Sequence, residues 1–216
     1  MANLGVNYKN TGRLAEALPL LKEGYRAAKR YPKLRGVGAA LLVGYVRAGK
    51  TEQAVALAKE LLADARMQLP KESPQLASQL ALMGASLLQA KAFAEAEPIL
   101  RECLAIREKT QPEERTTFNT TSMLGGALSG QKKYAEAEPL LLAGYAGMKQ
   151  REAKIPPPAK DRLTAALERL AQLDEALEKK DEAAKWRKEL EAQKESTERP
   201  NFDIPHPQTS PGTQGK

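Results

Sequence analysis

Apolar residues recur along the chain at the spacing of one helical face, and the arrangement repeats at intervals of 37, 42, 41 and 46 residues. The alanines that align these repeats are Ala17, Ala54, Ala96, Ala137 and Ala183. Thirteen residues before the first four stand Leu4, Leu41, Met83 and Leu124, and nine residues before them stand Tyr8, Tyr45, Leu87 and Leu128. Offsets of four and seven residues keep side chains on one face, so each unit is predicted to begin with an amphipathic helix.

Each alanine belongs to a phrase that is predicted to begin a second helix. The phrase reads LAEALPLL, FAEAEPIL and YAEAEPLL at Leu14–Leu21, Phe93–Leu100 and Tyr134–Leu141. A turn between the two helices is predicted at Gly12, Gly49, Lys91 and Lys132. The prolines of the phrase are expected in the first helical turn, because the N–H groups there have no intrahelical acceptor. These prolines are Pro19, Pro98 and Pro139.

The sequence therefore predicts an all-α solenoid of about five antiparallel helix pairs. The units are expected at residues 2–32, 36–69, 75–110, 114–154 and 159–194. The proline-rich stretch 195–216 has almost no apolar periodicity and is predicted to be disordered. Composition agrees, because 42% apolar residues with only 5% aromatics favour close-packed helices over a β-sandwich. No apolar run approaches the roughly 20 residues that span a bilayer, so no membrane insertion is expected.

One segment, GYVRAGKT at Gly44–Thr51, matches the phosphate-binding pattern G-x-x-x-x-G-K-[ST]. A P-loop requires a parallel strand before it and backbone N–H groups that are free to surround the phosphates. In the register of the repeats, Gly44 lies inside a first helix and Gly49 lies at the turn that follows it. A nucleotide-binding enzyme that uses this segment is therefore a disfavoured alternative.

Side chains suited to catalysis or metal binding are scarce. The single histidine, His206, lies in the proline-rich tail, which excludes His-based triads and multi-histidine metal sites. The single cysteine, Cys103, aligns with Gly24 and Gly144 at a predicted helix–helix contact, so a small buried side chain is expected there. One cysteine also fits a reducing cytoplasm. We expect a cytoplasmic, non-enzymatic protein with no cofactor and no metal.

Pairs of acidic residues recur at one position of the unit, as Glu95/Glu97 and Glu136/Glu138. Two nearby carboxylates are also an arrangement used in acid–base catalysis. Their repetition in equivalent units favours a structural role instead, in which they stabilise helix N-termini by about 0.3–1 kcal/mol each.

The net charge of +7 is concentrated near the N-terminus, where residues 1–50 hold ten Lys/Arg against two acids. Four of these cations are spaced 4, 3 and 4 residues apart and form a possible basic ridge: Lys22, Arg26, Lys29 and Lys33. A solvated helix face is the usual explanation of such a ridge. The alternatives are binding of an acidic protein surface, nucleic acid or anionic lipid. Only Tyr25 and Tyr31 are near enough to stack on bases, so nucleic-acid binding is disfavoured.

The repeated phrases resemble the tetratricopeptide repeat (TPR) family, in the longer variety found in kinesin light chains and in many bacterial proteins. The similarity is most specific in FAEAEPILRECLAIREK (Phe93–Lys109) and YAEAEPLLLAGY (Tyr134–Tyr145), and it covers about residues 2–192. The last unit departs from the pattern, since Asp174 replaces an aromatic residue and Glu178 replaces the turn glycine. The resemblance implies a right-handed superhelix whose first helices line a concave groove.

The resemblance also implies which residues contact a partner in that groove. The family's groove positions correspond to Ala2, Val6, Lys9, Val43, Arg47, Ala81, Ala85, Gln89, Asn119, Ser122 and Ser129. This lining is small, mildly polar and lightly charged, so it is suited to an extended peptide or a helix.

We therefore predict a scaffold for protein–protein interaction. The alternative, which rests on family analogy alone, is a docking or regulatory segment of a larger bacterial signalling protein, for example one linked to a Ser/Thr kinase. Because Met1 falls almost at the start of a first helix, the N-terminal end is expected to self-associate or to follow a missing upstream domain.

Overall fold

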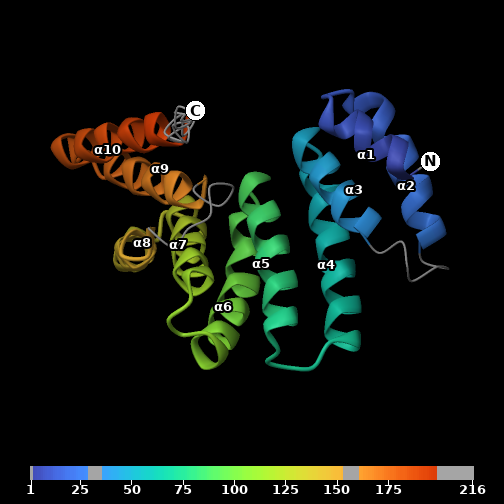
Figure 1. The fold of residues 1–216 in the computed structure, drawn as a ribbon, viewed down its shortest axis with the longest axis horizontal. Helices are drawn as coiled ribbons and strands as arrows, with labels where there is room; N and C mark the ends of the chain where they lie inside the picture. The colour runs from blue at the N-terminus through green and yellow to red at the C-terminus, as the bar shows by residue number, and fades with distance from the viewer. Residues whose placement is uncertain (1, 29–35, 153–160, 199–216) are drawn as a thin grey trace, which may run out of the picture.

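The described part of the computed structural model comprises residues 2–28, 36–152 and 161–198, and it forms ten helices (Figure 1). The first helices of the pairs are α1 (Ala2–Asn10), α3 (Gly36–Arg47), α5 (Pro74–Gln89), α7 (Arg115–Gly130) and α9 (Asp161–Ala176). The second helices are α2 (Leu14–Ala28), α4 (Thr51–Gln68), α6 (Phe93–Thr110), α8 (Tyr134–Lys149) and α10 (Lys180–Glu198). The predicted all-α array of five helix pairs is confirmed.

The apolar register of the sequence is what packs each pair. In α5, Ser73 caps the N-terminus by accepting a hydrogen bond from the Leu76 N–H, and Pro74 occupies the first turn. The buried stripe of that helix includes Leu80, Met83 and Leu87. The aligned alanines of the second helices are all buried, with exposed fractions from 0 to 5%. The repeat unit is therefore defined by apolar side chains that are buried together in the core.

A single type of turn joins the helices of every pair. Its central residue has a positive φ at Gly12, Gly49, Lys91, Lys132 and Glu178. At Gly49 the N–H donates to the Val46 carbonyl, and the next N–H, of Lys50, donates to the Tyr45 carbonyl. This is the Schellman arrangement that satisfies the last carbonyls of a helix. The predicted turn positions are confirmed, and the last pair uses the same turn although it lacks the glycine.

The turn gives a first testable expectation. Because a left-handed backbone costs a residue with a Cβ about 1 kcal/mol, Lys132→Gly is expected to raise the free energy of unfolding by about 0.5–1 kcal/mol. Gly49→Ala is expected to lower it by about 1 kcal/mol for the same reason. The control is Lys133→Gly, at a residue with φ −83°, which should give no gain. Urea unfolding of the three variants measures this, and a destabilised Lys132→Gly protein would contradict it.

The prolines do not lie where the sequence analysis placed them. Because α2, α6 and α8 begin three residues before the aligned alanine, Pro19, Pro98 and Pro139 are the sixth residue of each helix, in its second turn. A proline there removes one helical hydrogen bond instead of none. The expectation of a first-turn proline is therefore wrong. The phrase begins at the first residue of the helix, not before it.

The pairs stack in chain order from α1/α2 at one end to α9/α10 at the other (Figure 1). Each first helix contacts the next first helix, and each second helix contacts the first helix that follows it. Among the described residues, no two second helices pack together to a comparable extent. Since the first helices approach one another more closely than the second helices do, the array curves with α1, α3, α5, α7 and α9 on its inner side. We call the surface of these five helices the inner face.

Small residues allow the closest helix contacts, as the sequence predicted. A Cβ added at Gly144 would lie 2.6 Å from the Ser122 nitrogen and 2.8 Å from the Phe118 carbonyl oxygen. At the equivalent position of α6, the buried thiol of Cys103 lies 3.1 Å from the Ala77 carbonyl oxygen. Helices of one pair therefore meet backbone to backbone at this point.

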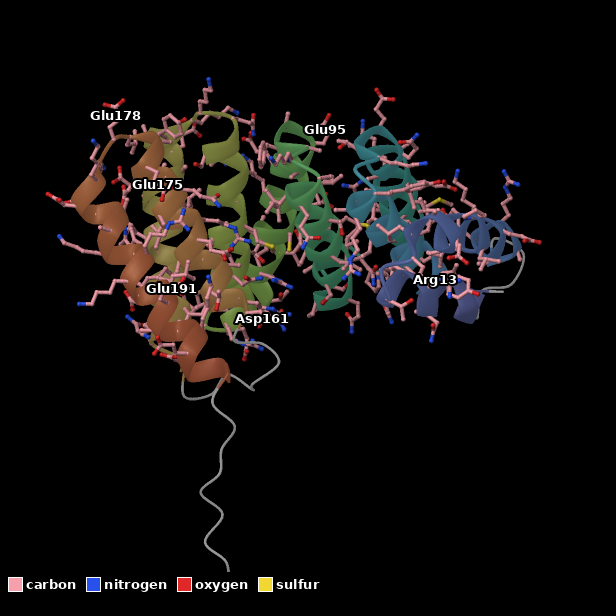
Figure 2. All side chains as sticks on the ribbon, turned by 90° about the horizontal axis from the view of Figure 1, so that it is seen from above. Arg13, Glu95, Asp161, Glu175, Glu178 and Glu191 are labelled. Atoms are coloured by element: carbon pink, nitrogen blue, oxygen red, sulfur yellow. The ribbon has the colours of Figure 1, made fainter. Side chains whose placement is uncertain are left out.

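The C-terminal end differs slightly from its predicted limits. Helix α10 continues to Glu198, four residues beyond the expected boundary at residue 194. The remainder of the segment predicted to be disordered, residues 199–216, lies outside the described residues. Trp186 of α10 packs half-buried against the core. Figure 2 shows the turn residue Glu178 at the tip of the α9/α10 pair, at the opposite end of the array from Arg13.

Candidate partner-binding face

Most of the residues predicted to contact a partner lie at the surface of the inner face. Seven of them are half-buried: Val6, Lys9, Val43, Ala81, Ala85, Asn119 and Ser129. Arg47 and Gln89, at the ends of α3 and α5, are exposed. In α5 the predicted positions Ala81, Ala85 and Gln89 follow one another at intervals of four, on the face opposite the buried stripe. The side chain of Ala2 is outside the described part of the structure.

The polar groups of this face are few and widely spaced. The Arg47 Nη1 donates a hydrogen bond to the Lys9 carbonyl at 3.2 Å, which links α3 to α1. Ala81 and Ala85 leave room for a backbone to approach α5 closely, and the Gln89 side chain is an exposed donor and acceptor. The inner face therefore exposes a few hydrogen-bonding groups among small side chains.

Ser122 is an error in the predicted set. Its side chain is fully buried, and its Oγ accepts a hydrogen bond from the Arg169 Nη1 at 3.1 Å. The register assigned it to the surface, but the close approach of α8 at Gly144 and the stacking of α9 on α7 cover it. Ser122 is thus a packing residue, and no partner can reach it without separating helices.

Two side chains of the inner helices were missed by the sequence mapping. Leu82 on α5 is 40% exposed and lies seven residues before Gln89, so it stands on the same face. Arg169 on α9 lies against Gly126 of α7, where burial lowers the pKa of its guanidinium to about 10. Leu82 could have been predicted from its helical spacing to Gln89. Arg169 could have been predicted only if the groove positions had been extended to α9.

The basic ridge is described only in part. Lys22 and Arg26 are exposed on α2, and the Lys22 ammonium lies 5.7 Å from the centre of the Tyr45 ring. This distance fits a cation–π contact and favours the reading of a solvated helix face. Lys29 and Lys33 lie outside the described residues.

The P-loop-like segment has the wrong backbone for a phosphate. Residues 37–43 lie within helix α3, not in a strand, and Gly44 is buried in the same helix against Leu18. The N–H groups of Gly49 and Lys50 are used in the turn described above. Thr51 begins α4, and its hydroxyl lies 3.3 Å from the Ala90 carbonyl. Gly44–Thr51 therefore matches the phosphate-binding pattern by chance, because the turn between α3 and α4 has glycine and lysine at adjacent positions.

The single cysteine has the buried surroundings expected of a packing residue. Burial raises the pKa of the Cys103 thiol, which makes it a poor nucleophile. In the residues that the structure describes, no cluster of three or more metal-ligating side chains is found. No helix among these residues is both long enough and apolar enough to cross a bilayer.

The two acids of each pair have different roles. The expectation that both stabilise a helix N-terminus is therefore wrong for the second acid. Glu95 and Glu136 lie in the first turn of their helices, as predicted. Glu97 and Glu138 instead bind the lysine at the turn of the next pair: Lys133 lies 2.8 Å from Glu97, and Lys179 lies 2.6 Å from Glu138. The second acid of each pair therefore joins neighbouring repeats.

Glu97 provides a pH-dependent prediction. Hydrogen bonds from Lys133, Gln131 and Arg101 lower its pKa from the ordinary 4.5 to about 2. A carboxylate with a lowered pKa stabilises the fold above about pH 4.5, and this stabilisation is lost as the pH falls towards 2.

We expect the free energy of unfolding of wild type to fall by about 1 kcal/mol more between pH 5 and pH 2 than that of Glu97→Gln. Urea unfolding across this range measures the difference. The control is Glu108→Gln, an exposed residue of the same helix. Parallel pH curves for wild type and Glu97→Gln would refute the assignment.

Comparisons with known proteins agree with the repeat architecture. Residues 1–31 and 76–110 match the tetratricopeptide repeat family model. None of the curated proteins matches the chain.

Several solved structures share the fold. Nearly identical TPR-like repeats of kinesin light chain type from Podospora anserina are similar with a TM-score of 0.65 at 20% identity, covering 92% of this chain and 95% of that one. BtubC (BKLC) from P. vanneervenii has a TM-score of 0.65 at 19% identity, covering 99% and 84%. MamA from Desulfovibrio magneticus RS-1 has a TM-score of 0.54 at 17% identity, covering 91% and 94%.

Proposed function

We propose that this chain, which is a tetratricopeptide repeat protein of five helix pairs, is a non-enzymatic scaffold that binds a peptide or helix of a protein partner on its inner face. The observation that carries the proposal is the stacking of the five first helices, which gives one continuous surface lined by small and mildly polar side chains. Arrays of this type present such surfaces for protein partners.

The chemistry of the face indicates the kind of partner segment. Val6, Val43 and the exposed Leu82 offer apolar contacts on three successive first helices. Arg47 and Gln89 lie at the ends of their helices and can donate hydrogen bonds to main-chain carbonyls or to an acid. We propose a segment with spaced apolar side chains, bound by its backbone as much as by its charges. We place the protein in the cytoplasm, because its one cysteine is a buried thiol.

The proposal is tested by cross-linked pull-down from the source cell's lysate. Wild type is compared with Arg47→Glu/Gln89→Glu, which puts two acids on the inner face. The matched control is Lys59→Glu/Gln53→Glu, which makes the same charge change at exposed positions of α4. We expect a protein that wild type and the control capture equally and that the inner-face variant loses by about tenfold or more. Equal capture by all three proteins would reject binding at this face.

A further inference from the structure

Three arginines from different helices meet at one edge of the array. Arg107 comes from the last turn of α6, Arg115 is the first residue of α7, and Arg162 is the second residue of α9. The Arg107 Nη1 donates to the carbonyl of Thr116, the residue after Arg115, and α7 packs against α9, so the three side chains come from adjoining helix ends. The charges of Arg115 and Arg107 are also within reach of Arg162. We call these residues the arginine cluster. Figure 2 marks the place by Asp161, which precedes Arg162 at the start of α9.

Within the cluster, the Arg107 side chain is held in place by hydrogen bonds. Its side chain is 5% exposed, and its Nη1 donates to the Thr116 carbonyl and to the Thr120 hydroxyl, each at 2.5 Å. Among the described residues, neither its buried Nε nor the buried Nη1 of Arg115 has a hydrogen-bond acceptor. Buried N–H groups of a charged side chain are costly to leave without an acceptor. The site is therefore built for a group that brings acceptor oxygens.

No carboxylate of the described residues neutralises the cluster. None of the ion pairs found among them includes Arg107, Arg115 or Arg162, and of the two acids just before α7, Glu113 pairs with Arg151 and Glu114 is exposed. Partial desolvation of the exposed Arg162 side chain first, and then repulsion from Arg115 and Arg107, lower the pKa of its guanidinium. The segment 153–160, which precedes α9, contains no Asp or Glu. Among the residues that the structure describes, these three cations thus have no countercharge.

We propose that the arginine cluster is a binding site for a phosphate dianion, in the form of a phosphomonoester on a side chain of the partner or as the free ion. Guanidinium groups are planar forks that match phosphate oxygens, and three of them suit a dianion better than a single carboxylate. The N-termini of α7 and α9 add positive potential at the same edge. Glu114 and Asp161, which flank the site in sequence, are exposed.

The partner-bound form of this site rests on the proposed scaffold function. Because Arg115 and Arg162 belong to first helices, the cluster borders the inner face, and a segment bound there can place a phosphorylated side chain against it. Phosphorylation would then control binding, since a neutral hydroxyl offers the cluster no charge.

The experiment is a titration followed by nuclear magnetic resonance of backbone amides and arginine Nε–H groups, at pH 7.5 and constant ionic strength. The probes are O-phospho-L-serine, inorganic phosphate and acetate. The variant is Arg162→Gln, at an exposed residue whose loss should leave the fold intact, and the control is Arg187→Gln, at a residue that pairs with Glu175.

We expect saturable shifts from the two phosphates at the Arg107 Nε–H and around residues 115 and 162. Arg162→Gln should weaken this binding by about tenfold, as expected for one lost charge-assisted contact, while Arg187→Gln should not change it. Tighter binding of O-phospho-L-serine would identify a phosphorylated side chain as the source, and equal binding would identify the free ion. Either result supports the site.

The proposal fails if neither phosphate gives a saturable shift, if Arg162→Gln binds like wild type, or if acetate binds as tightly as phosphate. The inner-face variant Arg47→Glu/Gln89→Glu should bind phosphate like wild type. Failure of the phosphate site and failure of the scaffold function are therefore observed separately.

Discussion

Gly144→Ala is expected to lower the free energy of unfolding by about 2–3 kcal/mol. In an ordinary helix interior the same change stabilises, by about 0.5–1 kcal/mol, so the sign is the informative result. The new Cβ would meet the Ser122 nitrogen at 2.6 Å and the Phe118 carbonyl oxygen at 2.8 Å. These are backbone atoms of α7, which cannot rotate away as a side chain can. Helices α7 and α8 must therefore separate.

The matched control for this variant is Gly36→Ala. A Cβ at Gly36, the first residue of α3, meets nothing within 4 Å. Urea unfolding should show Gly36→Ala at or slightly above the stability of wild type. If Gly144→Ala were as stable as Gly36→Ala, the backbone contact between α7 and α8 would be wrong.

Trp186→Ala is expected to cost about 3 kcal/mol, because it removes the side chain that closes the C-terminal end of the core. The indole Nε1 donates to the Asp174 Oδ2 at 2.9 Å, and its ring packs edge-on against Tyr145 with 5.6 Å between centroids. Asp174 is only 6% exposed, so the loss of this donor leaves a buried carboxylate with less compensation.

Two further variants separate the contributions of the tryptophan. Trp186→Phe keeps an aromatic ring against Tyr145 but has no N–H for Asp174, so an intermediate loss of about 1–2 kcal/mol is expected. Asp174→Asn keeps an oxygen acceptor and should cost less than Trp186→Phe. Thermal or urea unfolding measures all three. A Trp186→Ala protein within 0.5 kcal/mol of wild type would show that the last pair is not anchored here.

The departures of the last unit from the family pattern are explained by this contact. At the position of Asp174 the family has an aromatic residue, and no partner for a buried acid could be identified from the spacing of residues within the unit. The structure supplies one from α10, twelve residues later, in the Trp186 indole. The positive φ at Glu178 preserves the turn without glycine, at a local cost that the packing of α9 and α10 offsets.

The pair architecture could be predicted because it depends on features that repeat. The buried alanines, the apolar positions before them and the turn at Gly49 each recur in several units, so one register explains them all. The starts of the second helices were predicted less accurately. A proline such as Pro98 is tolerated in either the first or the second helical turn. The sequence alone did not distinguish these two positions.

The surface of the array was harder to predict, because exposure depends on how neighbouring pairs stack. Ser122 has the register of a groove residue, yet the glycine at 144 and the arginine at 169 cover it. The arginine cluster was even harder to predict from the sequence. Arg107, Arg115 and Arg162 belong to three helices, and no spacing within one unit indicates that they meet.

Binding of a partner segment on the inner face can be tested by site-specific photo-cross-linking. A photoreactive amino acid is placed at Gln89, on α5, or at Gln53, an equally exposed glutamine on the second helix α4. We predict that illumination in the lysate joins the Gln89 protein to one partner, and that the Gln53 protein forms no such adduct. An adduct from Gln53 and none from Gln89 would contradict the claim and place the partner on the outer helices.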